Sequence, residues 1–191
     1  MSDKTVTNVV VRIVLDGIED VLGKNGLNAL LNFGNMSQLI NNKPDYSFER
    51  NFTDEQYTAI ISSIYTIIGV KGSKAIMRQV GDATAKQIIK SGILDSLNDF
   101  KKEEKLLKAL EIYVMGSKRG EVTIEDGNIV FDNKMCTTCL NVTDKAPVCT
   151  FVNGIIDGLA KWAGVEGKRS VETKCKAMGD DSCRHEVLPI E

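Results

Sequence analysis

The chain has 191 residues, of which 42% are hydrophobic, and 24 basic against 26 acidic residues give a formal net charge of −2. A chain of this length can bury an apolar core without covalent cross-links, and we expect one domain over residues 1–191. The balanced charge offers no basic surface for nucleic acid. No segment approaches the roughly 20 apolar residues of a membrane span. The run 9–16 is broken by charge and lacks a signal-peptide cleavage site, so we expect a cytoplasmic protein.

Helical periodicity dominates about the first 115 residues. An apolar stripe with i, i+3, i+4 spacing begins at Val10, and Gly23 and Gly26 interrupt it before a shorter helical turn around Leu30. Residues 34–51 are rich in asparagine and predict a loop. Thr53 and Gln56 then form a capping box, which marks the start of the next helix. That helix is expected to bury Tyr57, Ile60, Ile61, Ile64 and Ile68.

Two more helices complete this part of the chain. Residues 71–91 predict one with Ile76, Val80 and Ala83 facing inward, and Gly81 on it favours close packing against another helix. Residues 106–114 predict an amphipathic helix that follows the charged run 101–105, which we interpret as a solvated surface.

The pattern changes at Gly116. Residues 122–131 alternate between apolar and polar side chains around an Asp126-Gly127 turn, which predicts a β-hairpin. Pro147 predicts the first turn of a helix whose apolar stripe ends at Ala163. Residues 170–175 and 184–188 then predict two strands joined by a polar turn. The predicted fold is α+β: a helical N-terminal part packs on a small antiparallel sheet made of two hairpins that flank one helix.

All five cysteines lie in the last third of the chain, at positions 136, 139, 149, 175 and 183. In a cytoplasmic protein, clustered thiols are more often metal ligands or redox groups than disulfides. The Cys136-x-x-Cys139 spacing is a common half-site for zinc, so spacing alone favours a site of four cysteines. Glu172 and Cys175 are three residues apart, so both can bind one ion only if a bulge or a strand end re-aims one side chain. Spacing does not decide between these ligand sets.

A resemblance bears on this choice. The segment from Cys149 onward, with its helix and the run Glu172-x-x-Cys175-x-Ala-x-Gly-Asp-x-x-Cys183, resembles the 4-vinyl reductase domain family, also described as hydrocarbon-binding. The strong match covers about residues 147–187. The family shares its fold with subunits of the TRAPP vesicle-tethering complexes. Members that sense aromatic compounds hold zinc with three cysteines and one glutamate, which implies Cys149, Glu172, Cys175 and Cys183 as ligands here.

Zinc in that set would be structural, because no coordination position stays open for chemistry. The resemblance leaves Cys136 and Cys139 unassigned. They could form a redox dithiol, a second and more labile metal site, or inert buried thiols, and a four-cysteine site without Glu172 stays open as well. Asp180 and Arg184 are candidates for hydrogen bonds to the ligands.

Two further side chains in this part of the chain have structural interpretations. His185, the only histidine, is expected to be a half-exposed strand residue, and Trp162 a core or dimer contact. With one histidine, acid–base pairs of histidines are excluded.

The resemblance implies a non-enzymatic domain that binds a small apolar or aromatic molecule, as a sensor or carrier, and that forms a homodimer. The helices at 57–68 and 106–114 are the expected walls of its pocket. The helical part has no histidine, which favours an apolar ligand over a phenol. One alternative is an enzyme or accessory protein in tetrapyrrole vinyl-group reduction, although no flavin or nicotinamide motif is present. Another is a structural assembly module of the TRAPP-subunit type.

Overall fold

The structure is a computed structural model that describes residues 4–117, 119–140 and 142–190. Its helices are α1 (Asn8–Phe33), α2 (Asp54–Ile68), α3 (Val70–Lys90), α4 (Lys102–Ser117) and α5 (Thr150–Ala163). Strands β1 (Val6–Thr7) and β2 (Arg50–Phe52) form a small antiparallel pair. Strands β3 (Glu121–Glu125), β4 (Asn128–Asn133), β5 (Lys168–Lys174) and β6 (Cys183–Pro189) form one antiparallel sheet in the order β3-β4-β6-β5. Short 3-10 turns lie at Ser37–Leu39, Asp95–Leu97 and Lys176–Met178.

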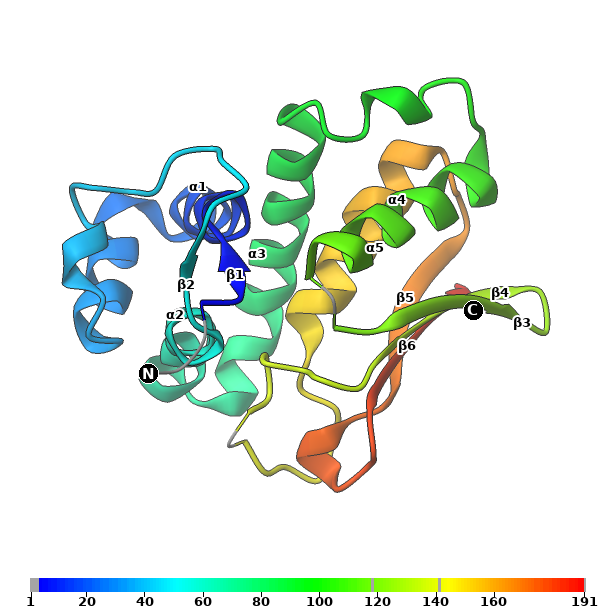
Figure 1. Ribbon diagram of the computed structural model, residues 1–191. Helices are drawn as coiled ribbons and strands as arrows, with labels where there is room; N and C mark the ends of the chain where they lie inside the picture. The colour runs from blue at the N-terminus through cyan, green and yellow to red at the C-terminus, as the bar shows by residue number, and fades with distance from the viewer. Residues whose placement is uncertain (1–3, 118, 141, 191) are drawn as a thin grey trace.

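The predicted α+β class is confirmed: helices precede a sheet in which every pairing is antiparallel. The two predicted hairpins join into one sheet because β4 pairs with β6, with Phe131 opposite His185 and Asn133 opposite Cys183. Figure 1 shows α1 and α2 on one side of α3, and α5, α4 and the sheet on the other. The main hydrophobic core extends from Val6 to Val187 and includes side chains of both parts.

Helices α3 and α5 cross at very short distance, because glycines face each other at the crossing. A Cβ atom at Gly81 would lie 2.1 Å from the backbone oxygen of Phe151, and one at Gly154 would lie 2.1 Å from that of Arg78. The close packing predicted for Gly81 is therefore found. Arg78 and Ser170 both bond Asp157, which fixes β5 against this helix pair.

Several local predictions are confirmed. Gly23 has φ 69° and interrupts α1, and the Thr53–Gln56 capping box starts α2. The Asp126-Gly127 turn joins β3 to β4.

Three local predictions are wrong. The α5 helix begins at Thr150 rather than at Pro147, because Cys149 has non-helical φ and ψ and its side chain points into the thiol cluster. The expected loop at 34–51 contains a 3-10 turn and ends in β2. Ile68 is 37% exposed, since it lies in the last turn of α2 beyond the packed part of that helix.

Candidate metal centre and ligand cavity

The five cysteines meet in one buried cluster at the end of the sheet nearest the start of α5. Cys149, Cys175 and Cys183 have no exposed surface, Cys136 and Cys139 are 4% exposed, and all five are free thiols. In Figure 1 the connection from β4 to α5, which carries Cys136 and Cys139, passes beside the turn between β5 and β6. Residues that are up to 47 positions apart in the chain, Cys136 and Cys183, therefore become potential ligands in one region.

The donor atoms form two groups that overlap. In one, Cys136, Cys139, Cys149 and Cys183 have all sulfur atoms within 4.8 Å of one another, and in the other Cys149, Glu172, Cys175 and Cys183 do so with their donor atoms. Measured Sγ–Sγ distances are 3.5 Å for Cys136–Cys149, 3.4 Å for Cys139–Cys183 and 3.7 Å for Cys149–Cys183. Sulfurs that bind one tetrahedral zinc at ~2.3 Å lie about 3.8 Å apart. Both groups have the size that such an ion requires.

A bulge in β5 turns Glu172 and Cys175 toward the same place. The register of β5 against β6 shifts between Glu172 and Lys174. This is the irregularity that two ligands three residues apart on a strand require. Cys175 then leads into the 3-10 turn at Lys176–Met178, which Gly179 ends with φ 98°. Asp180 accepts a 2.7 Å hydrogen bond from the Cys175 backbone N–H, so the turn that presents Cys175 is closed by its own side chain.

The carboxylate of Glu172 is set up asymmetrically. Oε2 accepts a 2.7 Å hydrogen bond from the backbone N–H of Cys149, whereas Oε1 is buried with no hydrogen-bond partner in the described part of the chain. Burial, followed by the nearby Cys175, raises the pKa of Glu172 to about 9. A buried oxygen without a partner is costly unless a proton or a cation binds there. The donor set therefore fits a metal ion at Oε1.

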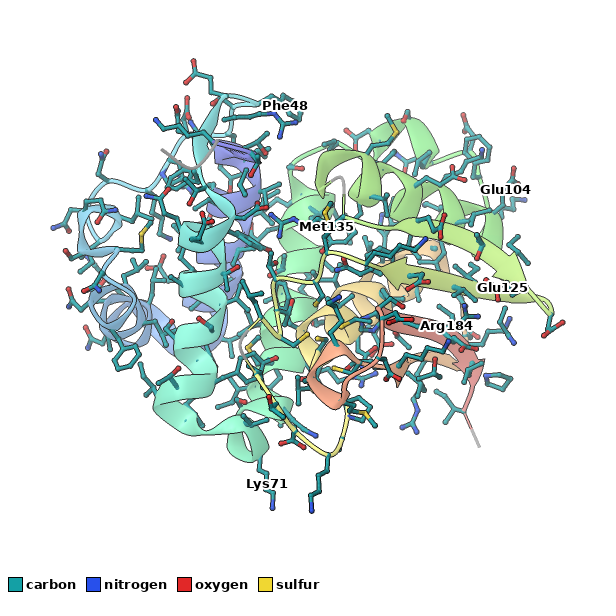
Figure 2. The ribbon with its side chains drawn as sticks, turned by 60° about the horizontal axis from the view of Figure 1, so that its bottom comes forward. Phe48, Lys71, Glu104, Glu125, Met135 and Arg184 are labelled. Carbon is teal, nitrogen blue, oxygen red and sulfur yellow. The ribbon has the colours of Figure 1, made fainter. Side chains whose placement is uncertain are left out.

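Backbone groups also support the thiolates. The backbone N–H of Lys176 lies 3.4 Å from the Cys183 Sγ and donates to it. Cys149 caps the N-terminus of α5, where the helix dipole favours negative charge. Arg184 does not take part: it bonds Glu125 and Glu186 on the outer side of the sheet, and Figure 2 shows Arg184 and Glu125 together there. Of the two residues expected to support the ligands, the structure brings only Asp180 to them.

His185 is fully buried, so the expectation of a half-exposed residue is wrong. Its Nδ1 lies 2.7 Å from the Oδ1 of Asn153, which also accepts from the hydroxyl of Ser170, and its ring stacks on Phe131. Burial lowers the pKa of His185 to about 4. The alternation pattern of β6 places residue 185 on the inner face, and this is the signal that sequence reasoning underused. Trp162 is partly buried against the core, with Lys105 Nζ 3.9 Å from its ring centre.

A cavity of about 640 Å³ lies next to the thiol cluster. Apolar side chains of α1, α4 and α5 form most of its walls, among them Val10, Ile13, Val14, Ala109, Ile112, Phe151, Val152 and Ile155. The predicted wall from α4 is found, but α2 contributes little beyond Tyr57, and α1 takes its place. The cavity also reaches Thr137 and Thr138, the two residues between Cys136 and Cys139.

Three polar side chains line this cavity: Tyr57, Tyr113 and Arg119. Burial raises the pKa of Tyr57 to about 12 and that of Tyr113 further, so both stay protonated at neutral pH. Arg119 pairs with Asp54 through Nη2, while its Nη1 is buried without a partner among the described residues. Its guanidinium lies 5.2 Å from the Tyr57 ring centre.

A second hollow of about 810 Å³ lies at the surface between the start of α1 and the end of α3. Its lining is largely charged, with Arg12, Asp16, Glu19 and Asp20. It shares Val9, Phe48 and Ile93 with the apolar cavity. Phe48 is 71% exposed and projects from the edge of the molecule in Figure 2. The surface hollow therefore adjoins the mouth of the apolar cavity.

Comparison with known proteins identifies the family of the second half. Residues 129–189 match the family model of the 4-vinyl reductase domain. This chain carries a 4-vinyl reductase domain. The match includes Cys136, Cys139 and the four ligands implied by the resemblance, so the resemblance found in the sequence is confirmed for this segment.

A curated relative of this 4-vinyl reductase domain protein is an uncharacterised protein of Methanocaldococcus jannaschii, 27% identical over 113 residues. The aligned stretch covers 59% of this chain and 62% of that protein, less than two thirds of its length. A solved vinyl-4-reductase family protein from the same organism is 16% identical and covers 71% of this chain and 90% of its own. Its TM-score of 0.37 is too low to compare the two folds.

H-NOX structures match over nearly the whole length. An H-NOX protein from S. oneidensis in the Fe(II)NO state has a TM-score of 0.59 at 12% identity, covering 94% of this chain and 99% of that one. An oxygen-binding H-NOX domain related to soluble guanylate cyclases has a TM-score of 0.58 at 17% identity, covering 97% of each chain. At these identities the 4-vinyl reductase domain protein shares the fold of those proteins, and its ligand must be argued from its own residues.

No helix in the described ranges of the chain has both the length and the hydropathy needed to cross a lipid bilayer.

Proposed function

We propose that this protein is a zinc-stabilised domain that binds a small apolar or aromatic molecule, as a sensor or carrier without catalysis of its own. The observation that carries the proposal is the 640 Å³ cavity between α1, α4 and α5. Its volume falls in the range of small-molecule sites, which are typically apolar with a few polar groups that orient the ligand. The match to the 4-vinyl reductase domain supports the same class of function.

The polar groups define the ligand further. Two neutral phenols and the free Nη1 of Arg119 are all donors, so they suit a ligand that carries an oxygen acceptor at one end. The remaining walls are aliphatic or aromatic and favour a hydrocarbon body. An acidic or carbonyl group at Arg119 would satisfy the buried guanidinium nitrogen, which otherwise has no partner among the described residues.

Zinc is proposed at Cys149, Glu172, Cys175 and Cys183, as the resemblance implies. The partnerless Glu172 Oε1 supports this set over one of cysteines alone. The ion would tie the start of α5 to β5 and β6 and would have a structural role. Since Phe151 and Val152 follow Cys149 and line the cavity, the ion would also fix one wall of the ligand site.

Haem is the ligand that the similar H-NOX proteins suggest, since one was solved in an Fe(II)NO state and another with a distorted porphyrin. Haem iron is commonly held by a histidine. The single histidine of this chain lies behind Phe131, bonded to Asn153, and does not line the cavity. The residues present therefore do not fit a histidine-ligated haem, although the phenols of Tyr57 and Tyr113 are oxygen donors. We keep tetrapyrrole binding as a second outcome of the test.

Further parts of the proposal concern the whole molecule. We propose that residues 1–191 act as one domain, because the main core joins side chains of both parts. Free thiols in a buried cluster suit a reducing, cytoplasmic setting. A homodimer is proposed from the family resemblance, and no nucleic-acid contact is proposed, given the net charge of −2.

Native mass spectrometry of the purified protein tests the proposal, since it reports bound zinc, subunit number and any co-purified lipophilic compound together. Displacement of a fluorescent naphthalene-based probe then measures binding in the cavity. The substitution Ile112→Phe should fill the cavity and weaken probe binding. Leu107→Phe, on the same helix but outside the cavity lining, should leave it unchanged. Equal binding by both variants, or a Soret band on titration with haemin and no probe binding, would overturn the hydrocarbon-type ligand.

A further inference from the structure

We propose that the five cysteines and Glu172 bind two zinc ions as one cluster, in which the sulfurs of Cys149 and Cys183 bridge both ions. One ion would be held by Cys149, Glu172, Cys175 and Cys183. The other would be held by Cys136, Cys139, Cys149 and Cys183. The inference rests on the proposed zinc site and assigns a role to the two cysteines that this site leaves over.

The two donor groups overlap in the way a bridged pair requires. They share Cys149 and Cys183 and no other residue, and these two sulfurs are 3.7 Å apart. That distance is close to the edge of a zinc–sulfur tetrahedron, about 3.8 Å. Two tetrahedra that share this edge would place Cys136 and Cys139 on one ion and Glu172 and Cys175 on the other.

The number of donors agrees with this arrangement. Two four-coordinate ions need eight coordination positions, and six side chains fill them when two of the six serve both ions. Of the sulfurs, Cys136 lies 3.5 Å from the bridging Cys149, and Cys139 lies 3.4 Å from the bridging Cys183. Each terminal cysteine of the second ion is thus in contact with a different bridge.

Charge favours two ions over one. With all six donors ionised the cluster carries six negative charges in a region where every donor residue is buried. One divalent ion would leave four of these charges, and two ions would leave two. Buried charge without a partner is strongly unfavourable. The backbone N–H groups of Cys149 and Lys176 and the N-terminus of α5 supply the positive partners for what remains.

The chain around Cys136 and Cys139 is built for ligation. Backbone Val142 N–H bonds the Cys139 oxygen at 3.0 Å, and Asp144 N–H bonds the Ala177 oxygen at 3.0 Å, so this connection is fastened to the turn that carries Cys175. Thiolates in a four-sulfur site select zinc among the common biological divalent ions. The second ion would fasten the connection from β4 to α5 at its middle.

The number of ions is tested by native mass spectrometry of metal-free protein titrated with zinc under reducing conditions. Wild type should take up two ions. Cys136→Ser and Cys139→Ser should each keep one ion, and so should Glu172→Gln. The control Leu140→Ser changes the exposed neighbour of Cys139 and should keep two. Wild type that binds a single ion, or purified protein that contains iron and acid-labile sulfide, would overturn the proposal.

Bridging is tested on the wild-type protein, so the result does not depend on whether a variant folds. Loaded with ¹¹³Cd, the protein should give two ¹¹³Cd resonances that are split by scalar coupling between the metals, because the coupling passes through a shared sulfur. Two uncoupled resonances would overturn the bridged cluster. Protein that binds no zinc would overturn the proposed zinc site as well, whereas one ion lost in Glu172→Gln and kept in Cys136→Ser would overturn only the second ion.

Discussion

The backbone N–H of Cys149 donates a 2.7 Å hydrogen bond to Oε2 of Glu172, and the other oxygen of that carboxylate is buried without a partner among the described residues. One contact thus fixes both the residue at the start of α5 and the direction of the carboxylate. The hydrogen bond leaves Oε1 as the free donor atom of Glu172. Its position near Cys149, Cys175 and Cys183 suits it to be a fourth ligand.

Glu172→Gln should weaken zinc binding by at least roughly 10-fold, because an amide oxygen carries no charge and the pairing with the ion is lost. The rate of zinc transfer to a chromophoric chelator measures this. Glu166→Gln, at an exposed position before β5, is the matched control and should behave as wild type. Equal chelator resistance in both variants would contradict a role for Glu172 as a ligand.

Strand periodicity accounts for only part of this site. It places Glu172 and Cys175 on opposite faces, so the sequence could only state that a bulge was needed, and the register shift after Glu172 supplies it. Periodicity could not choose between the ligand sets, because the choice depends on how the connection 134–149 folds back. That connection has no regular period, and its position is decided by contacts with the distant turn at 175–183.

The helical part shows the same limit. Apolar stripes predicted that α1, α2, α3 and α4 exist, but they could not decide which pair would border the cavity. Tyr57 is the main contribution of α2, while α1 supplies Val10, Ile13 and Val14. The side chains that line a cavity and those that fill a core have the same hydrophobicity, so only packing separates them.

Gly81→Ala should destabilise the protein by about 1–3 kcal/mol, the usual cost of overpacking. The new methyl group would lie 2.1 Å from the Phe151 oxygen, so α3 and α5 would have to separate. Denaturant unfolding measures the change. Gly116→Ala, on α4 with no atom near the new methyl group, should instead leave stability unchanged or raise it. A destabilisation that is no larger for Gly81→Ala would contradict the close crossing.

Tyr65→Phe should cost about 1–2 kcal/mol, because the Tyr65 hydroxyl donates a 2.7 Å hydrogen bond to the Val148 oxygen and its loss leaves a buried carbonyl unpaired. Val148 directly precedes Cys149, so zinc should also leave this variant faster. The control is Tyr113→Phe, whose ring packs edge-on against Phe131 and keeps that contact without the hydroxyl. It should keep both stability and zinc. Similar losses in the two variants would show that the Tyr65 bond does not support the metal site.

Arg119→Gln should reduce the affinity for acidic aromatic compounds more than the affinity for neutral ones of the same shape. The reason is that the free Nη1 of Arg119 is the cationic donor in the cavity wall. A charge-assisted hydrogen bond contributes about 1.5–3 kcal/mol, so the selectivity between naphthoate and naphthalene should fall by about 10-fold or more. Calorimetric titration of both compounds checks this. An equal loss for both would indicate a steric or folding effect of the substitution.

Removal of zinc should weaken ligand binding in the cavity, because the same short segments serve both sites. Thr137 and Thr138 line the cavity and lie between Cys136 and Cys139, and Phe151 and Val152 line it directly after Cys149. Metal ions would hold these segments at their ends, so the cavity walls should become less ordered when the ions leave, and binding would then include the cost of ordering them. Probe affinity measured before chelation, after it and after zinc is restored should fall and then recover. Because the Cys136–Cys139 segment is itself part of the wall, Cys136→Ser should weaken probe binding more than Cys175→Ser, whose turn does not line the cavity. Unchanged affinity in the zinc-free protein, with its secondary structure intact by circular dichroism, would show that the two sites are independent.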